Sequence, residues 1–239
     1  MVVSSDESEY RGRGGGAFRA AMLSGAVAFA LCLAVLVATP AETYWINDCG
    51  NKALLAERLL ATGFRELGFD YPAAAIDPAA SAFPIVPPFA VALDGGFLSV
   101  YPPAYPVLAA PFLAAFGPLG LRIPAALGVA ACAGLLTLWL GAAVGSAWAF
   151  GAGAALALAT PLFFYGITLW EHSLTVALGL GAWVLASRDR PARLFWAGWL
   201  VASACWFREE LALMGVALAF AVLVRWRRAP RCRPRASCS

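Results

Sequence analysis

The sequence predicts an all-α protein: a polytopic bundle of six or seven transmembrane helices with a long extracytoplasmic first loop. Hydrophobic residues make up 62% of its 239 residues and charged residues only 13%, whereas soluble domains are about half apolar and about a quarter charged. Several apolar segments are long enough to cross about 30 Å of hydrocarbon. The arginines cluster near the chain ends and at one internal turn, which is the pattern of membrane topology signals.

Composition also limits the classes of function. The net charge of +3 gives no reason to expect nucleic-acid binding. Three of the six cysteines, Cys32, Cys132 and Cys205, lie in apolar segments, where a thiol behaves as a small hydrophobe. There is no Cys-x-x-Cys pair, and the single histidine cannot complete a zinc site with Cys232 and Cys238. We therefore expect neither a disulfide framework nor a structural metal.

The chain is expected to begin with a disordered cytoplasmic lead over residues 1–19, which are polar and carry arginines around a run of glycines. The segment Ala20–Thr39 has no charge and about the 20 residues that one crossing needs. Because no small-x-small cleavage site precedes Pro40 and further apolar segments follow, a retained helix is favoured over a signal peptide.

The first outer loop, residues 40–103, breaks the apolar pattern with charged residues and prolines. Within it, Ala53–Thr62 predicts an amphipathic helix that lies on the membrane surface, with leucines on one side and charges nearer the other. Phe89–Val100 alternates weakly and contains Asp94-Gly95-Gly96, which predicts the turn of a β-hairpin.

The remaining apolar segments complete a transmembrane module over residues 20–225, which is followed by a basic tail over residues 226–239. These segments are Ala104–Phe116, Ile123–Val144, Trp148–Tyr165, Ser173–Ala186, Leu194–Phe207 and Leu211–Val224. Most tryptophans fall near segment ends, where an amphipathic ring sits well among lipid headgroups.

The number of spans depends on Ala104–Phe116, which is short and contains Pro106 and Pro111. If this segment crosses the membrane, there are seven spans, and two arginine clusters fall outside, against the positive-inside rule. If it is re-entrant or interfacial, there are six spans, and both clusters fall inside. The two clusters are Arg188-Asp189-Arg190 and Arg225-Trp226-Arg227-Arg228. Six spans are favoured.

Six spans place several ionisable groups on the outer side. Asp48, the pair Glu171-His172 and the group Arg208-Glu209-Glu210 then face the same compartment. Ionisable groups at membrane depth are costly and tend to mark function. The six-span topology therefore predicts one shared site.

Four motifs follow one another along the transmembrane module: Tyr44-Trp45-Ile46-Asn47-Asp48 ahead of a helix over Lys52–Leu60, Tyr101-Pro102-Pro103-Ala104-Tyr105-Pro106, Arg122-Ile123-Pro124-Ala125-Ala126-Leu127, and Ala159-Thr160-Pro161-Leu162-Phe163-Phe164-Tyr165. Together they resemble the GT-C glycosyltransferases, in particular protein O-mannosyltransferases and the aminoarabinose transferase of lipid A (glycosyltransferase family 39). Tyr101 replaces a family lysine, and Glu171 only loosely matches a later family aspartate. Family members are commonly longer, so the chain is expected to be an N-terminal part of such an enzyme.

The resemblance implies a multispanning enzyme that takes a sugar from a polyprenyl-phosphate carrier and attaches it to an acceptor on the outer face. In the family, the early acid acts as general base or helps to hold a metal. This implies Asp48 as the catalytic residue and leaves a divalent metal ion open. Transfer to a hydroxyl needs a base for the hydroxyl proton. Without the resemblance, Asp48 is more simply explained as a helix cap.

The other candidate residues would bind substrate. They are Lys52, Tyr101, Glu171, His172, Arg208 and Glu209. Arginine pairs well with phosphate, which the donor carries, and the alternative for Arg208 is an interfacial salt bridge to Glu209 or Glu171. A charged helix start also explains Glu171. For Lys52, snorkelling at the membrane surface is favoured.

The expected function is therefore a glycosyltransferase of the inner or plasma membrane. Its partners would be membrane lipid and a polyprenyl-phosphate-linked sugar, with no nucleic acid. The alternatives are a non-enzymatic multispanning protein, such as a transporter-like or scaffold module, and an inactive fragment of the same class of enzyme. The scaffold alternative predicts no dependence on Asp48.

Overall fold

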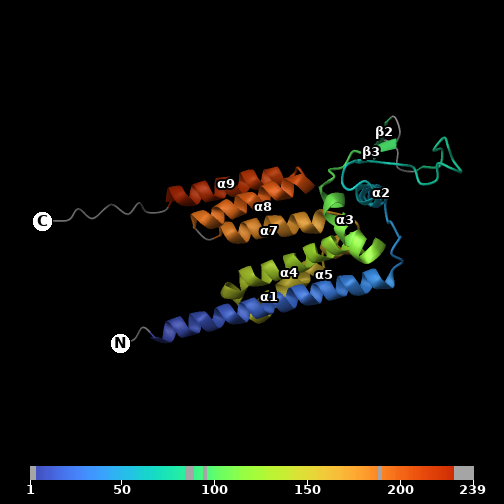
Figure 1. Ribbon diagram of the computed structural model, residues 1–239. Coiled ribbons are helices and arrows are strands. Elements are labelled where there is room, and N and C mark those ends of the chain that lie inside the picture. Colours follow the sequence, from blue (N-terminus) through green and yellow to red (C-terminus); the bar gives the residue numbers. More distant parts are fainter. Residues whose placement is uncertain (1–3, 84–88, 94–95, 188–189, 229–239) are drawn as a thin grey trace.

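The computed structural model describes residues 4–83, 89–93, 96–187 and 190–228, and these are mostly helical (Figure 1). The helices are α1 (Ser4–Ala38), α2 (Asn47–Ala61), α3 (Ala104–Phe116), α4 (Ile123–Val144), α5 (Ser146–Leu158), α6 (Leu162–Ile167), α7 (His172–Ala186), α8 (Pro191–Phe207) and α9 (Leu211–Arg228), with a 3-10 helix, η1, at Gly117–Arg122. The strands are β1 (Gly68–Phe69), β2 (Ala90–Leu93) and β3 (Gly96–Ser99).

The long helices form one bundle with α4 at its centre. α4 packs against α1, α5 and α7, and α8 and α9 continue the bundle beyond α7. Figure 1 shows α2, α3 and the small sheet gathered at one end of the bundle, whereas α1 begins and α9 ends at the other. The polar first loop therefore covers a single end of an apolar bundle.

Two helical stretches, Gly15–Ala38 and Ala104–Val144, are long and apolar enough to cross a membrane. Only 28% of the apolar window in the first stretch and 33% of that in the second is buried. Large side chains such as Phe18 and Trp139 therefore face outward. Apolar surface of this extent is rare on soluble monomers. Length, composition and exposure together suggest that these helices associate with a membrane.

Within the second stretch, α3 and α4 are separate helices. The backbone turns at Gly117, whose φ of 65° favours glycine. η1 then folds back on α3 so closely that a Cβ at Gly120 would lie 2.0 Å from the carbonyl oxygen of Phe112. The hydroxyl of Tyr105 donates a hydrogen bond of 3.0 Å to the carbonyl of Leu121 and fixes this turn. α3 consequently packs on α2 at the end of the bundle.

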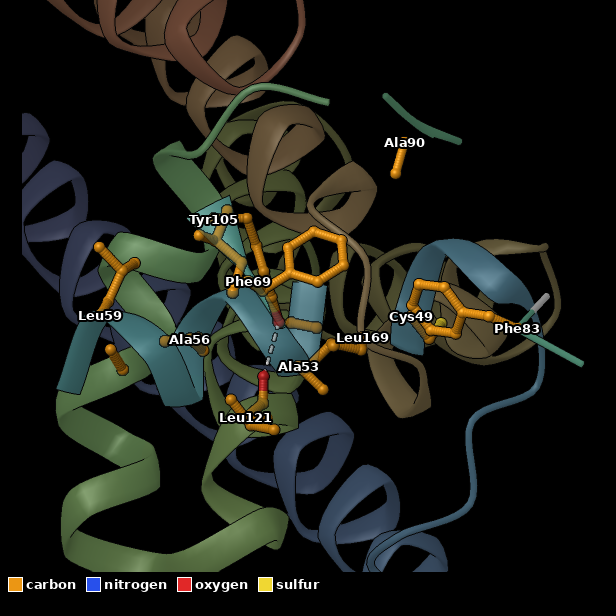
Figure 2. Close-up of a cluster of buried hydrophobic side chains, with 14 residues drawn as sticks. Cys49, Ala53, Ala56, Leu59, Phe69, Phe83, Ala90, Tyr105, Leu121 and Leu169 are labelled. Atoms are coloured by element: carbon orange, nitrogen blue, oxygen red, sulfur yellow. Dashed lines mark hydrogen bonds between the residues drawn. The ribbon is translucent and has the colours of Figure 1, made fainter. Parts of the chain in front are cut away.

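The helix expected over Ala53–Thr62 begins earlier, at Asn47, and does not lie on a surface. Its inner side belongs to a buried core, shown in Figure 2, that it shares with β1, α3 and the turn before α7. The core includes Cys49, Ala53, Ala56, Leu59, Phe69, Tyr105, Leu121 and Leu169. The leucine pattern indicated one apolar side, but partners from distant segments cover the neighbouring polar side as well.

A three-stranded sheet lies over α2. β3 is central and pairs antiparallel with both β1 and β2, and Leu93 faces Gly96 where β2 ends and β3 begins. Phe97 of β3 stacks with Phe69 and meets Phe83 edge-on, with ring centroids 6.2 and 4.8 Å apart. These rings attach the sheet to the core around α2.

Element boundaries differ from expectation in three further places. α1 begins at Ser4, within the segment expected to be a disordered lead. The apolar segment around Pro161 is divided into α5 and α6, because proline lacks the amide hydrogen that a continuous helix needs. α9 continues to Arg228, into the expected basic tail. Residues Asp94, Gly95, Arg188, Asp189, Cys232, Cys238 and the rest of 229–239 lie outside the described residues.

The closest contact between α4 and α7 yields a stability prediction. A Cβ at Gly128 would lie 2.6 Å from the amide nitrogen of Leu174 and 2.7 Å from the carbonyl carbon of Ser173. Because backbone atoms cannot rotate away, Gly128→Ala must push the two helices apart. We expect a loss of about 1–3 kcal/mol in the free energy of unfolding, measured by thermal unfolding in detergent.

Gly151→Ala is the matched control for Gly128→Ala, because a Cβ at Gly151 meets nothing within 4 Å. This variant should be neutral or slightly more stable, since alanine is the better helix former. Equal stability of the two variants would contradict the close packing.

Candidate functional site

The candidate site is built on the first two turns of α2. Asp48 and Lys52 are four residues apart, which puts two side chains on the same side of a helix. Lys52 Nζ lies 2.8 Å from Asp48 Oδ2. Lys52 retains only 2% exposure and Asp48 only 8%. The expected position of Lys52 at the membrane surface is therefore wrong, because its ammonium group is enclosed by protein.

The turn before α7 supplies the other half of the site. Glu171 Oε2 lies 2.6 Å from Lys52 Nζ, although 119 residues separate them in the chain. The indole nitrogen of Trp170 donates a hydrogen bond to Asp48 Oδ2. The ring centroid of Tyr101 lies 5.2 Å from Lys52 Nζ, within the range of a cation–π contact. These contacts fasten α2 to the start of α7.

The ammonium group makes two buried carboxylates tolerable. Removing an ion from water costs several kcal/mol even after the protein relaxes, and two neighbouring carboxylates would also repel each other. The positive charge of Lys52 offsets both the desolvation cost and the repulsion between the carboxylates. Arg208 adds a second positive charge, with Nη1 3.6 Å from Glu171 Oε1. The four charges of this cluster balance.

His172 lies between two aromatic rings. Its ring centroid is 4.5 Å from that of Tyr165 and 4.8 Å from that of Trp170. Nε2 of His172 lies 2.8 Å from Arg208 Nη1. A guanidinium can only donate, so Nε2 accepts and we assign the ring proton to Nδ1. Nδ1 is buried and has no hydrogen-bond partner among the described residues.

Arg208, in the turn between α8 and α9, forms the open edge of the site. Its side chain keeps 30% exposure and pairs with Glu210. The hydrogen bond to Glu210 raises the pKa of Arg208, and the same contact lowers the pKa of Glu210. The guanidinium is therefore a permanent positive charge that an anionic ligand can reach.

Glu209 does not join the site, contrary to expectation. Arg208 ends α8 with an extended backbone, at φ −149° and ψ 117°, and the chain then turns, with the amide of Leu211 donating to the carbonyl of Arg208. In this turn the carboxylate of Glu210 pairs with the guanidinium of Arg208. Glu209 is exposed and makes no side-chain contact with the site among the described residues.

The remaining predicted site residues lie together in one connected cluster. They are Asp48, Lys52, Tyr101, Glu171, His172 and Arg208. Two further members, Tyr165 and Trp170, were missed, whereas Glu210 was expected on the same side but was given no role. Trp170 was attributed to the lipid interface, although it stands directly before Glu171, and Tyr165 was noted only as the end of a motif.

Arg122, also outside the expected site, fixes the chain that leads into α2. It is 1% exposed. Its Nη2 donates hydrogen bonds to the carbonyl oxygens of Ala41, at 2.7 Å, and Thr43. Arg122 thus holds the connection between α1 and α2 shortly before the helix that carries Asp48.

Two hollows lie beside the end of α1 and the start of α2. One, of about 370 Å³, lies beside the first turns of α2 and includes Tyr44, Trp45 and Glu57 in its lining. The other is an apolar groove of about 450 Å³ along the last turns of α1. It is lined by Leu31, Ala34, Val35, Ala38, Leu158 and Phe163. The first offers aromatic rings and a carboxylate, and the second offers only hydrocarbon.

The donor set does not fit the divalent metal ion that the resemblance leaves open. Within the described ranges, no three His, Cys, Asp or Glu side chains are grouped as metal ligands. Within the site, the carboxylates of Asp48 and Glu171 have the ammonium of Lys52 between them.

No known protein family, curated protein or solved structure matches the chain. The site is therefore interpreted from its own geometry and chemistry. The decisive features are a buried carboxylate–ammonium–carboxylate cluster and an exposed guanidinium beside it.

The cluster predicts a large difference between two cations of α2. Lys52→Met leaves two buried carboxylates unpaired and should cost about 3–5 kcal/mol of unfolding free energy. Arg58 pairs with Glu66 and Asp70 on the exposed side of the same helix. Arg58→Met should cost less than about 1 kcal/mol. Chemical unfolding of both variants in detergent measures the difference, and similar losses would show that Lys52 is not buried in an ion cluster.

Proposed function

We propose that the chain is a membrane glycosyltransferase that transfers a sugar from a polyprenyl-phosphate donor to an acceptor hydroxyl on the outer face of the cell membrane. One observation carries the proposal: polar side chains from four separate segments converge at one end of an apolar bundle. The group combines a carboxylate with an unpartnered oxygen and a guanidinium open to solvent. Transfer from a phosphate-linked sugar needs both functions.

Asp48 is the proposed general base. Its Oδ2 accepts from Lys52 and Trp170, whereas its Oδ1 is buried and has no partner among the described residues. A buried acceptor without a partner is costly, so a ligand hydroxyl that donates to Oδ1 is favoured there. Lys52 and Trp170 act as positioning residues, because they fix the carboxylate through the oxygen that does not react.

The proposed reaction is a single displacement. The acceptor oxygen forms a bond to the anomeric carbon while the bond from that carbon to the phosphate oxygen breaks. The hydroxyl proton passes to Asp48 Oδ1, and the polyprenyl phosphate leaves with the bonding electrons. A positioned base contributes about 10²–10⁴-fold to such a rate.

Arg208 is the proposed partner of the donor phosphate. A guanidinium fork matches the geometry of phosphate oxygens. Glu210, which now pairs with Arg208, has a side chain that is 57% exposed, so a phosphate can displace it into water. His172 Nε2 holds the other side of the guanidinium and keeps its direction. The arriving phosphate thus replaces one carboxylate without exposing a buried charge.

The two hollows support substrates of this class. The apolar groove beside α1 suits an isoprenoid chain, because it is lined only by hydrocarbon and by one aromatic ring. The hollow beside α2 suits a sugar, whose polar hydroxyls can reach Glu57 while its apolar face rests on Trp45. Both are proposed as substrate positions.

The proposal includes six spans: α1, α4, α5 with α6, α7, α8 and α9. The packing of α3 on α2 and the fold-back of η1 support an interfacial α3. The start of α8, with Arg190 and Arg193, and the end of α9, with Arg225 and Arg227, are at the opposite end of the bundle from α2 (Figure 1). In the proposed topology this end is cytoplasmic, in agreement with the positive-inside rule.

A second candidate function has its own support. The ion cluster fastens α2 to the start of α7, which is also what a non-enzymatic scaffold would require. The two functions differ at Asp48 Oδ1, because no described contact uses this atom. A scaffold needs the charge of Asp48, whereas a transferase also needs its free oxygen as a base.

The first test replaces Asp48 by asparagine, which keeps the shape of the side chain but removes its basicity. Asp48→Asn should lower the rate of transfer from a lipid-linked sugar by about 10²–10⁴-fold while membrane insertion is retained. The assay uses protein reconstituted in vesicles with radiolabelled donor. Asp70→Asn is the control, since Asp70 forms only an exposed ion pair. If Asp48→Asn retains transfer, Asp48 is not the general base and the scaffold function is favoured.

The second test determines the side of the membrane on which the site lies. Arg190 and Glu209 are both exposed, at opposite ends of α8. In intact cells, a membrane-impermeant thiol reagent should label Glu209→Cys and should label Arg190→Cys only after lysis. External labelling at position 190 would contradict the six-span arrangement.

A further inference from the structure

Lys52 Nζ lies between two carboxylates, a place where a metal ion would also be attracted. Its Nζ lies 2.8 Å from Asp48 Oδ2 and 2.6 Å from Glu171 Oε2. The face of Tyr101 lies 5.2 Å from the same atom. Two of the three N–H donors of the ammonium group are used by the carboxylates, and its charge faces the Tyr101 ring. The charge of Lys52 is therefore already balanced within the protein.

A divalent ion would compete poorly for this position. Magnesium requires about six oxygen ligands in near-octahedral geometry, and two carboxylate oxygens approach the position of Lys52 Nζ. The hydrophobic core around α2 leaves little room for the water molecules that would complete the shell. The positive charges of Lys52 and Arg208 would also repel the incoming ion.

We propose that Lys52 is a built-in cation that takes the place of a divalent metal, so that the site binds no such ion and sugar transfer is metal-independent. The part concerning transfer rests on the proposed glycosyltransferase function, whereas the part concerning ion binding does not. The resemblance to the GT-C enzymes left open that the early acid is a metal ligand. Here Asp48 instead pairs with Lys52, four residues later in the same helix.

Divalent-ion binding after removal of Lys52 can be measured. If Lys52 fills a cation position, its removal must leave two carboxylates facing a space of cation size. Lys52→Met removes the charge while keeping most of the side-chain volume. This variant should gain saturable binding of a divalent ion, and the ion should restore part of the stability that the substitution removes, because a ligand that binds only the folded state stabilises it.

The experiment uses the full chain in detergent after treatment with a chelator, and Mn²⁺ as the probe. Two signals are recorded: the loss of the free Mn²⁺ paramagnetic resonance signal on binding, and the midpoint of thermal unfolding. The wild-type protein should show neither binding nor a shift in its midpoint. Lys52→Met should show saturable binding and a rise in its midpoint, and Lys52→Met with Glu171→Gln should lose both.

Arg58→Met is the matched control. Arg58 also bridges two carboxylates, those of Glu66 and Asp70, but on the exposed side of α2. Freed exposed carboxylates are free to move apart in water, so this variant should show no rise in its midpoint. If Lys52→Met gains no more than Arg58→Met, Lys52 does not fill a cation position and the inference is overturned.

The wild-type protein alone also decides the inference, should Lys52→Met not fold without the ion. Saturable Mn²⁺ binding by the wild type that Asp48→Asn removes would overturn it. So would sugar transfer that stops with a chelator and returns with Mn²⁺. A complete lack of transfer under all conditions counts against the proposed function only, because the binding measurements are read without it.

Discussion

The ion cluster of Lys52 with Asp48 and Glu171 is the interaction on which the candidate site depends. It connects the first turns of α2 with the turn before α7, which lies 119 residues later in the chain. Because all three groups are buried, neither segment can move away without leaving a charge unpaired in an apolar environment, which costs several kcal/mol. The position of the Asp48 carboxylate is thereby coupled to the packing of the bundle.

The bundle positions the second half of the cluster through α4. Ser173 donates a hydrogen bond of 2.7 Å to the carbonyl of Ala125, and the glycine at position 128 lets the two helices approach to backbone contact. The start of α7 is therefore fixed against α4. This also fixes the positions of Trp170, Glu171 and His172, which lie at or directly before the start of α7. Arg122 does the same for α2 from the other side, through the carbonyls of the connecting chain. Both halves of the site are held by contacts to the η1–α4 region.

Sequence reasoning found the apolar segments and most of the cluster for one physical reason. Charged side chains are costly beside long apolar runs, so Asp48, Glu171 and Arg208 were conspicuous wherever they occurred. Reasoning from local pattern was less successful where distant residues decide the outcome. The burial of Lys52 depends on Glu171, which is 119 residues away, and no spacing rule within α2 indicates it. The choice between Glu209 and Glu210 depends on the turn that follows Arg208, which hydropathy does not report. The number of spans and the catalytic role of Asp48 stay predictions.

The separation of Lys52 from Glu171 also has a consequence for biosynthesis. Ribosomes add about 5–20 residues per second, so the 119 residues between the two positions take about 6–24 s to emerge. During this interval Lys52 has Asp48 as a partner but lacks its second carboxylate, Glu171. The helix α2 therefore cannot yet be fastened to the turn before α7. The first loop must therefore remain outside the finished core until the middle of the chain has been made. A nascent chain arrested before α7 would expose the polar side of α2 to chaperones and proteases, which makes completion of this cluster a late checkpoint in the assembly of the protein.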